Sequence, residues 1–228
     1  MNYDCILING CSYSAPAAHR VYGDFLAEHF GAPLVNLALD GSSNQRLLRT
    51  SIEELTRLKK EYQNPLVVVG WTFIRRLEVW YQGTHQKLIS QIPDHTDSRF
   101  VTLDWIIGYN EATVEQKAMF GSEASIHKLL MDFYTNLYMF AHTLESQNVD
   151  YCFFSGPNNS VYPVHSFPYI NSMEQVQWIV NNPQIFNLDN FCISNWAKEN
   201  DPECNQTGHL SENGHKKFAG LILDKLTD

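Results

Sequence analysis

Three short apolar runs that each lead into a glycine-containing loop constrain the fold of this chain most strongly. Strands that are buried on both faces of a parallel sheet are apolar throughout, and these runs have that character. The segments between the runs instead repeat apolar residues at the helical period. This alternation predicts an α/β domain in which crossover helices join parallel strands. The expected strands are residues 3–8, 33–37 and 66–69, followed by Gly10, Gly41 and Gly70, and the expected helices are residues 17–30 and 43–62.

The remainder of the chain continues the pattern with one interruption. Residues 80–120 mix glycines with aromatic side chains, and they predict an insertion that lies over a site, because long connections in compact domains are often functional. Residues 157–203 read as irregular apart from one short helix. We therefore predict a single domain over residues 1–228, a three-layer α/β/α flavodoxin-like sandwich with a mostly parallel central sheet. The other expected elements are helices at 125–146 and 173–180, a strand at 150–155 and a last helix ending near residue 226.

Charge and composition bear on partners and location. The chain has 25 acidic and 16 basic residues, a formal net charge of -9, which argues against general nucleic-acid binding because phosphate contacts need clustered Lys and Arg. No stretch approaches the ~20 apolar residues of a membrane-spanning helix, and the first residues do not resemble a signal peptide. The five cysteines are irregularly spaced and do not form a disulfide framework. We therefore expect a cytoplasmic protein with no nucleic-acid partner and no membrane partner.

Residues that follow the strands carry the candidate chemistry. Active sites of doubly wound sheets lie beyond the C-terminal ends of the strands, and Ser12 follows the first expected strand directly. A serine hydroxyl needs a base to become a nucleophile, and the oxyanion that develops needs preorganised donors such as a backbone N–H. His209 lies just before the last expected helix, from which an imidazole reaches the same edge. The sequence thus makes Ser12 and His209 candidates for a reactive pair. The alternatives are a plain strand–helix turn at Ser12 and a structural or exposed histidine at 209.

The order of these short motifs resembles the SGNH (GDSL-like) hydrolases. Gly10-Cys11-Ser12-Tyr13 resembles the first motif of that family, Gly41 the glycine of the second, Gly70-Trp71-Thr72 the third, and Gln206-Thr207-Gly208-His209 the fourth. The resemblance implies the SGNH hydrolase fold, with Ser12 as nucleophile and His209 as base. It also implies an oxyanion hole formed by the N–H groups of Ser12 and Gly41 together with Thr72.

Three positions depart from the family pattern. Cys11 replaces the aspartate of the first motif, which spares the nucleophile, and Thr72 replaces the asparagine of the third. The loss of one oxyanion donor typically lowers the rate by about 100- to 1000-fold. Gln206 replaces the acid that would orient His209 and supplies no charge, although Asp201 and Glu203 lie close to it in the sequence. The acid that supports the base is left open among these residues.

Other residues next to the third strand are candidates for substrate binding. These are Trp71, Arg75 and Arg76, and a guanidinium at the strand edge suits a carboxylate or phosphate. The alternative for the arginines is a surface pair at the start of a helix. A thiolate nucleophile at Cys11 is a further alternative, which the family pattern disfavours.

Metal and cofactor chemistry have little support in the sequence. Cys192, Cys204, His209 and His215 lack a recognised zinc-ligand spacing. The glycine motifs that bind nucleotide phosphates are absent from the sequence, so we expect neither a metal nor a cofactor.

The resemblance implies a serine hydrolase that cleaves a small O-acyl ester, in particular an acetyl ester of a carbohydrate. Its partner is then a small-molecule or glycan ester, and the oligomeric state is left open. A different class of function also fits, because Thr72 and Gln206 favour a non-catalytic SGNH-like domain that binds a glycan or a protein. A flavodoxin-like nucleotide binder is the third interpretation.

Overall fold

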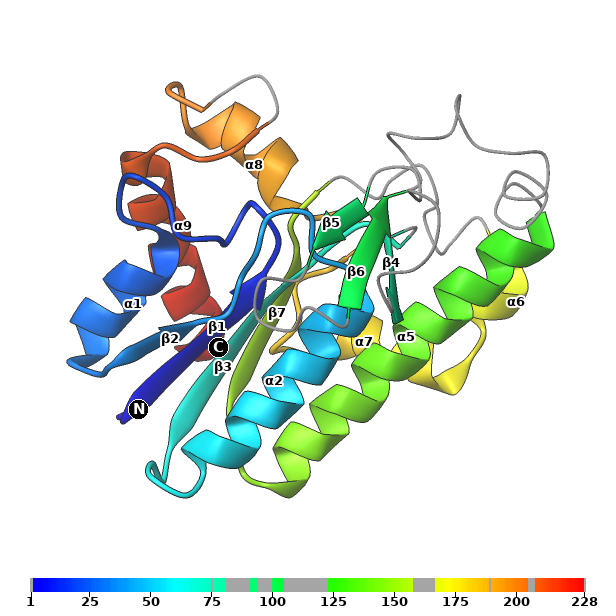
Figure 1. Cartoon of the computed structure of the whole chain (residues 1–228), viewed down its shortest axis with the longest axis horizontal. Helices are drawn as coiled ribbons and strands as arrows, with labels where there is room; N and C mark the ends of the chain where they lie inside the picture. The colour runs from blue at the N-terminus through cyan, green and yellow to red at the C-terminus, as the bar shows by residue number, and fades with distance from the viewer. Residues whose placement is uncertain are drawn as a thin grey trace.

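A parallel sheet forms the centre of the molecule, as seen in Figure 1. The computed structural model describes residues 2–74, 76–80, 91–93, 100–104, 123–157, 167–188, 190–204 and 208–227. Within them, four parallel strands are ordered β2-β1-β3-β7. Isolated parallel bridges from Ile185 and Cys192 continue the pairing beyond β7. The strands are β1 (Cys5–Gly10), β2 (Leu34–Asn36), β3 (Pro65–Trp71) and β7 (Tyr151–Ser155).

Helices cover both faces of this sheet. One face carries α1 and α9, which pack against each other, and the other carries α2, α5 and α7 (Figure 1). Among the described helices, none has the length and apolar character needed to cross a membrane. The bounds are α1 (Tyr22–Phe30), α2 (Asn44–Leu58), α5 (Glu123–Ser146), α7 (Glu174–Asn181) and α9 (Glu212–Thr227).

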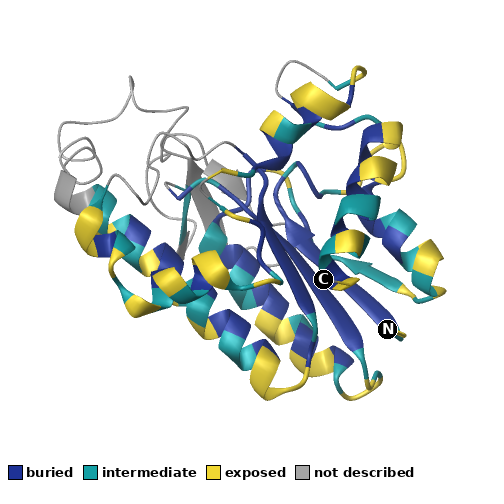
Figure 2. Ribbon diagram, turned by 180° about the vertical axis from the view of Figure 1, so that it is seen from behind, coloured by how far each residue is buried: buried dark blue, intermediate teal, exposed yellow. Residues whose placement is uncertain are grey.

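The strands are mostly apolar because each contributes side chains to two cores. Ile6 and Ile8 of β1 face the α1–α9 layer, whereas Cys5 and Leu7 face the α2–α5 layer. Every residue of β1 is buried, and the buried strands form the dark centre of Figure 2. Full burial of an Ile or Leu side chain contributes about 1.5–3 kcal/mol, so two packed faces account for the choice of residues. The predicted three-layer α/β/α sandwich with a mostly parallel sheet is confirmed.

Local signals define several helix ends. The Ser43 hydroxyl caps α2 by accepting a hydrogen bond from the Arg46 N–H at 3.2 Å. The Ser211 hydroxyl accepts from the Gly214 N–H at 3.1 Å and begins α9 in the same way. Gly31 ends α1 with a φ of 62°, a left-handed conformation that glycine adopts without strain.

A second, antiparallel sheet lies within the aromatic-rich region. Its order is β4-β6-β5, and a bidentate ion pair joins β4 to α2. Arg49 donates to the two carboxylate oxygens of Glu78 at 3.1 and 2.7 Å, and this carboxylate side chain is only 7% exposed. The strands are β4 (Arg76–Trp80), β5 (Gln91–Pro93) and β6 (Phe100–Asp104). The prediction that residues 80–120 cover a site stays a prediction, because most of these residues lie outside the described part of the chain.

Two helices correct the expectation that residues 157–203 are irregular. They are α6 (Pro168–Asn171) and α8 (Ile193–Asn200). In α8 only Ile193, Ser194 and Ala197 are buried, so its apolar face is too short to stand out as a helical period.

The buried side chain of His215 makes the free energy of unfolding depend on pH. This side chain in the first turn of α9 is 5% exposed, its Nδ1 has no hydrogen-bond partner among the described residues, and burial lowers its pKa to about 4. His19 and His209 also lower this pKa, and Asp201 opposes them. An unfolded chain takes up the same proton near pH 6.5, so acidification from pH 6.5 to 4 costs the folded state up to about 3 kcal/mol through this group.

A His215→Leu variant should therefore gain stability relative to wild type as pH falls through that window. Urea denaturation across a pH series measures the difference in free energy of unfolding between variant and wild type. Phe218→Leu on the same helix is the control, because its difference from wild type should not change with pH. An offset for His215→Leu that is constant from pH 7 to 4 would contradict the assignment.

Candidate active site

Ser12 lies in a tight turn immediately after β1. The N–H groups of Ser14 and Ala15 both donate to the Cys11 carbonyl, at 2.9 and 3.0 Å, and close the turn around Ser12. A Cβ atom on Gly10 would lie 2.4 Å from the Ser14 hydroxyl, so the turn needs glycine there. Ser12 is therefore held, half-buried, at the C-terminal edge of the sheet.

His209 reaches this edge from the segment before α9. Gly208, which precedes it, has a φ of 79°, and a Cβ there would lie 2.5 Å from the Ser194 carbonyl oxygen of α8. The close approach sets the path of the chain into His209. Its Nε2 lies 2.7 Å from the Ser12 hydroxyl oxygen, although 197 positions separate the two residues. The structure thus brings together the two residues that the sequence predicts as a reactive pair.

Burial and one carboxylate shift the pKa of the His209 imidazole in opposite directions. Desolvation lowers the pKa of His209, and the negative charge of Asp40 partly raises it again. A histidine with a lowered pKa is neutral at pH 7, and only neutral imidazole accepts a proton. His209 can therefore act as a base toward the Ser12 hydroxyl.

The loop after β2 brings Gly41 to the same edge. The Leu39 N–H donates to the Gly10 carbonyl at 3.1 Å, which joins this loop to the end of β1, and Gly41 has a φ of 75°. Among the described residues, the N–H groups of Ser12 and Gly41 donate to no protein acceptor. Unused N–H groups at a turn are the donors that an oxyanion site requires.

A buried arginine supports the Gly41 loop, and sequence reasoning missed it. Arg46 is 1% exposed, and its guanidinium donates to the Leu37 carbonyl at 3.0 Å and to the Ser42 hydroxyl at 3.4 Å. An arginine on the polar side of an expected surface helix gives no signal of burial, so only the folded structure identifies it.

Thr72 does not fit the oxyanion role expected of it. The residue is fully buried, and its hydroxyl accepts a hydrogen bond from Arg76 at 3.0 Å. Its backbone is paired with Asn44, whose side-chain oxygen accepts from the Thr72 N–H at 2.8 Å and whose NH2 group donates to the Thr72 carbonyl at 3.2 Å. Thr72 therefore joins β3 to the start of α2, and its hydroxyl is not exposed to a substrate.

Of the acids expected beside His209, Asp201 holds the chain segment that follows the histidine and not its ring. Asp201 is 1% exposed and accepts from the Ser211 N–H at 2.7 Å, from the Ser211 hydroxyl at 2.9 Å and from the Glu203 N–H at 3.2 Å. Within the described residues it makes no hydrogen bond to His209. The Glu203 side chain is exposed, and Gln206 lies outside the described residues.

The expected substrate-binding residues near β3 differ in how far they are exposed. Trp71 is 1% exposed and packs edge to face against Phe133, Phe140 and Phe153, so it is a core residue and the expectation of substrate contact is wrong. Arg76 is partly exposed beside Thr72, and Arg75 lies outside the described residues.

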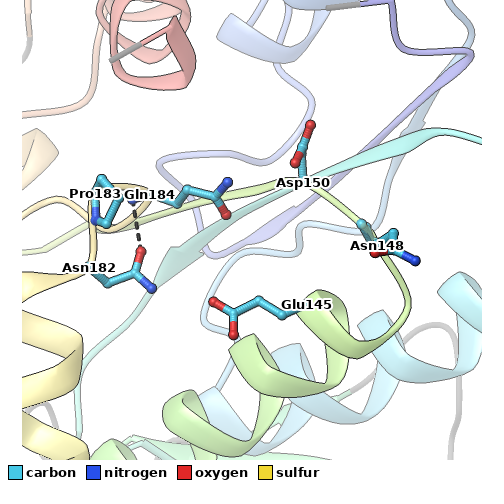
Figure 3. Close-up of a pocket in the computed structure, with 7 residues that line it drawn as sticks. Glu145, Asn148, Asp150, Asn182, Pro183 and Gln184 are labelled. Atoms are coloured by element: carbon cyan, nitrogen blue, oxygen red, sulfur yellow. Dashed lines mark hydrogen bonds between the residues drawn. The ribbon is translucent and has the colours of Figure 1, made fainter.

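Neither a metal cluster nor the pocket in Figure 3 adds to this site. In the described part of the chain no group of three or more His, Cys, Asp or Glu residues is placed to hold a metal ion. A hollow of about 380 Å³ lies at the opposite end of β7, lined by Glu145, Asn148, Asp150 and Gln184 among others (Figure 3). The pair at the C-terminal edge is therefore the candidate site.

Gly208→Ala should separate His209 from Ser12. The new Cβ meets the Ser194 backbone, and a left-handed φ costs a non-glycine residue about 1–2 kcal/mol even without a clash. We expect a loss of stability larger than that value in urea denaturation, together with weaker labelling of Ser12 by a fluorophosphonate.

Gly31→Ala is the matched control for this prediction. Its φ of 62° is also left-handed, but nothing lies within 4 Å of the added Cβ. Gly31 caps the end of α1 just before β2, so it lies at the edge of the sheet opposite the Ser12–His209 pair. Equal losses of stability in the two variants would show that the packing of Gly208 on Ser194 is unimportant.

Three solved structures resemble this chain along its length at low sequence identity. TesA is 13% identical, with 97% of both chains covered and a TM-score of 0.49. The acetyl xylan esterase AlAXEase is 15% identical, with 96% of this chain and 98% of that chain covered and a TM-score of 0.47. The psychrotrophic esterase EstA from Pseudoalteromonas sp. is 18% identical, with 99% and 95% covered and a TM-score of 0.45. TM-scores below 0.5 assign no activity to this chain, and no curated protein matches it.

In the structure Ser12 follows β1, Gly41 follows β2 and His209 precedes α9. One protein-family model, described as a family of unknown function (DUF6071), matches residues 13–165. That segment is more than half of the chain and includes neither Ser12 nor His209. The chain belongs to the family of unknown function DUF6071.

Proposed function

We propose that this chain is a serine hydrolase that cleaves small O-acyl esters. The observation that carries the proposal is the 2.7 Å contact between Ser12 Oγ and His209 Nε2 at the C-terminal edge of the sheet. A nucleophile and base within hydrogen-bond reach, next to unused backbone donors, are the parts that acyl transfer needs.

The proposed reaction has two steps. Ser12 Oγ attacks the ester carbonyl carbon while His209 Nε2 takes its proton, and the N–H groups of Ser12 and Gly41 stabilise the oxyanion. His209 then gives the proton to the departing alcohol, which leaves an acyl group on Ser12. Water attacks this acyl-enzyme with His209 as base, and the carboxylic acid departs while Ser12 regains its proton.

Arg76 is the described side chain with the best case for contacting substrate. It is partly exposed, and its charge lowers the pKa of the Tyr13 phenol, so it acts on the residue next to Ser12. A guanidinium near the ester favours substrates with a negatively charged or strongly polar group. A small acyl group on a sugar, presented with its hydroxyls toward Arg76, fits the proposal.

Ser12→Ala and His209→Gln should each lower hydrolysis of p-nitrophenyl acetate by at least about 1000-fold, because a nucleophile and its base act as a unit. Cys11→Ala is the matched control, since it removes the neighbouring thiol and leaves the proposed mechanism unchanged.

Equal activity in wild type and Ser12→Ala would exclude Ser12 as the nucleophile, and loss of activity in Cys11→Ala alone would assign the reaction to the thiol. A folded wild-type protein that neither hydrolyses acetyl esters nor reacts with a fluorophosphonate would instead indicate a non-catalytic binding domain.

The rate should depend on pH through His209. Since burial lowers its pKa, kcat/KM should fall on the acid side with an apparent pKa below 6.5. Asp40→Asn removes the charge that raises this pKa, so the acid limb should move to lower pH. Asp224→Asn on α9 is the control for a remote charge, and an acid limb that moves to higher pH in Asp40→Asn would contradict the expected role of Asp40.

A further inference from the structure

Tyr13, the residue that follows Ser12, lies face to face with the His209 imidazole. The two ring centroids are 4.3 Å apart and the ring planes differ by 1°. The Tyr13 side chain is 9% exposed, so its ring covers one side of the imidazole as part of the buried structure. A flat contact of this kind restricts the plane in which the imidazole can lie.

Two restraints are needed to orient an imidazole toward a hydroxyl. One sets the direction of Nε2 within the ring plane, and the 2.7 Å hydrogen bond to Ser12 Oγ supplies it. The other sets the plane itself, because the hydrogen bond to Ser12 fixes a direction and not the tilt of the ring about it. The parallel face of Tyr13 supplies this second restraint.

Tyr13 is itself held from two sides. Burial raises the pKa of its phenol to about 12, more than the neighbouring Ser194 hydroxyl lowers it, so the phenol stays neutral. A Cβ on Gly156, at the end of β7, would lie 3.2 Å from Tyr13 Cδ2, which shows how closely the ring packs there. The Ser194 N–H donates to the Gly156 carbonyl at 3.0 Å, so both supports of Tyr13 belong to one connected unit.

The same unit also contacts the segment that carries the imidazole. Gly208 packs against the Ser194 backbone, and it directly precedes His209. Ser194 therefore borders the Tyr13 phenol with its hydroxyl, and its backbone restricts the approach of the segment that leads to His209. Asp201 is hydrogen-bonded to Ser211 and does not take this part.

We propose that Tyr13 is the positioning residue for His209, and that its flat ring holds the imidazole in the plane from which Nε2 faces Ser12 Oγ. The inference rests on the proposed function, because positioning matters only if this pair reacts with an ester. The geometry that it claims is nevertheless measurable without a substrate.

Tyr13→Phe and Tyr13→Leu separate the flat ring from the phenol hydroxyl. Tyr13→Phe keeps the ring and should retain kcat for p-nitrophenyl acetate within a few-fold. Tyr13→Leu should lower kcat by about 10- to 100-fold with little change in KM, since a displaced catalytic group costs rate more than binding. It also uncovers the imidazole, so the acid limb of the rate profile should move to higher pH, toward 6.5.

Nuclear magnetic resonance of the imidazole gives a readout that does not depend on activity. The 15N shift of His209 Nε2, assigned with His209→Gln, reports its hydrogen bond to Ser12, and Ser12→Ala gives the value without that bond. Tyr13→Leu should move the shift toward the Ser12→Ala value, and Tyr13→Phe should keep it near wild type. Should Tyr13→Leu fail to fold, Tyr13→Met replaces it, because methionine fills the space without a flat face.

Tyr134→Leu is the matched control for a buried tyrosine, since Tyr134 is 4% exposed in α5 and lies outside the site. It should lower stability without changing the His209 signal or the pH profile. A Tyr13→Leu protein with a wild-type Nε2 shift and a wild-type pH profile would overturn the positioning role. A wild-type protein without esterase activity would refute the proposed function, while the Nε2 shift still decides whether Tyr13 orients His209.

Discussion

The parallel pairing of β1 with β2 on one side and β3 on the other is the constraint on which the site depends. In this register Gly10 lies opposite Gly70, and the Leu39 N–H after β2 donates back to the Gly10 carbonyl. The loops that follow the three strands therefore begin at one edge. Because β1 is buried on both faces, a slip by one residue would exchange its two sets of core side chains, which fixes the register strongly.

Features with a strong local signal were predictable from the sequence. The apolar runs indicate the strands of the parallel sheet, and the rule that sites lie at the C-terminal edge makes Ser12 and His209 candidates. The resemblance to the SGNH motifs then pairs them. Elements with weak signals were missed, namely α8, whose buried face is short, and the antiparallel strands β4, β5 and β6 between residues 76 and 104. The order of elements was thus easier to predict than the insertions between them.

The predictions that failed in the site concern the direction of side chains and competition for hydrogen bonds. Trp71 ends β3 on the face toward α5, and a motif places a residue on a strand without fixing which core it enters. Thr72 accepts from Arg76, and Asp201 satisfies donors at the start of α9 that would otherwise be left unpaired. Each polar side chain bonds to a donor or acceptor that lies close to it in the folded chain, and spacing in the sequence does not show which one that will be.

The distance along the chain between Ser12 and His209 affects when their contact forms during folding. A contact across 197 positions closes late, because a large loop must be ordered before that contact contributes to stability. In the proposed mechanism Ser12 gains its base only when the segment before α9 packs against the end of β1. An unfolded or partly folded chain therefore presents no activated serine under that mechanism.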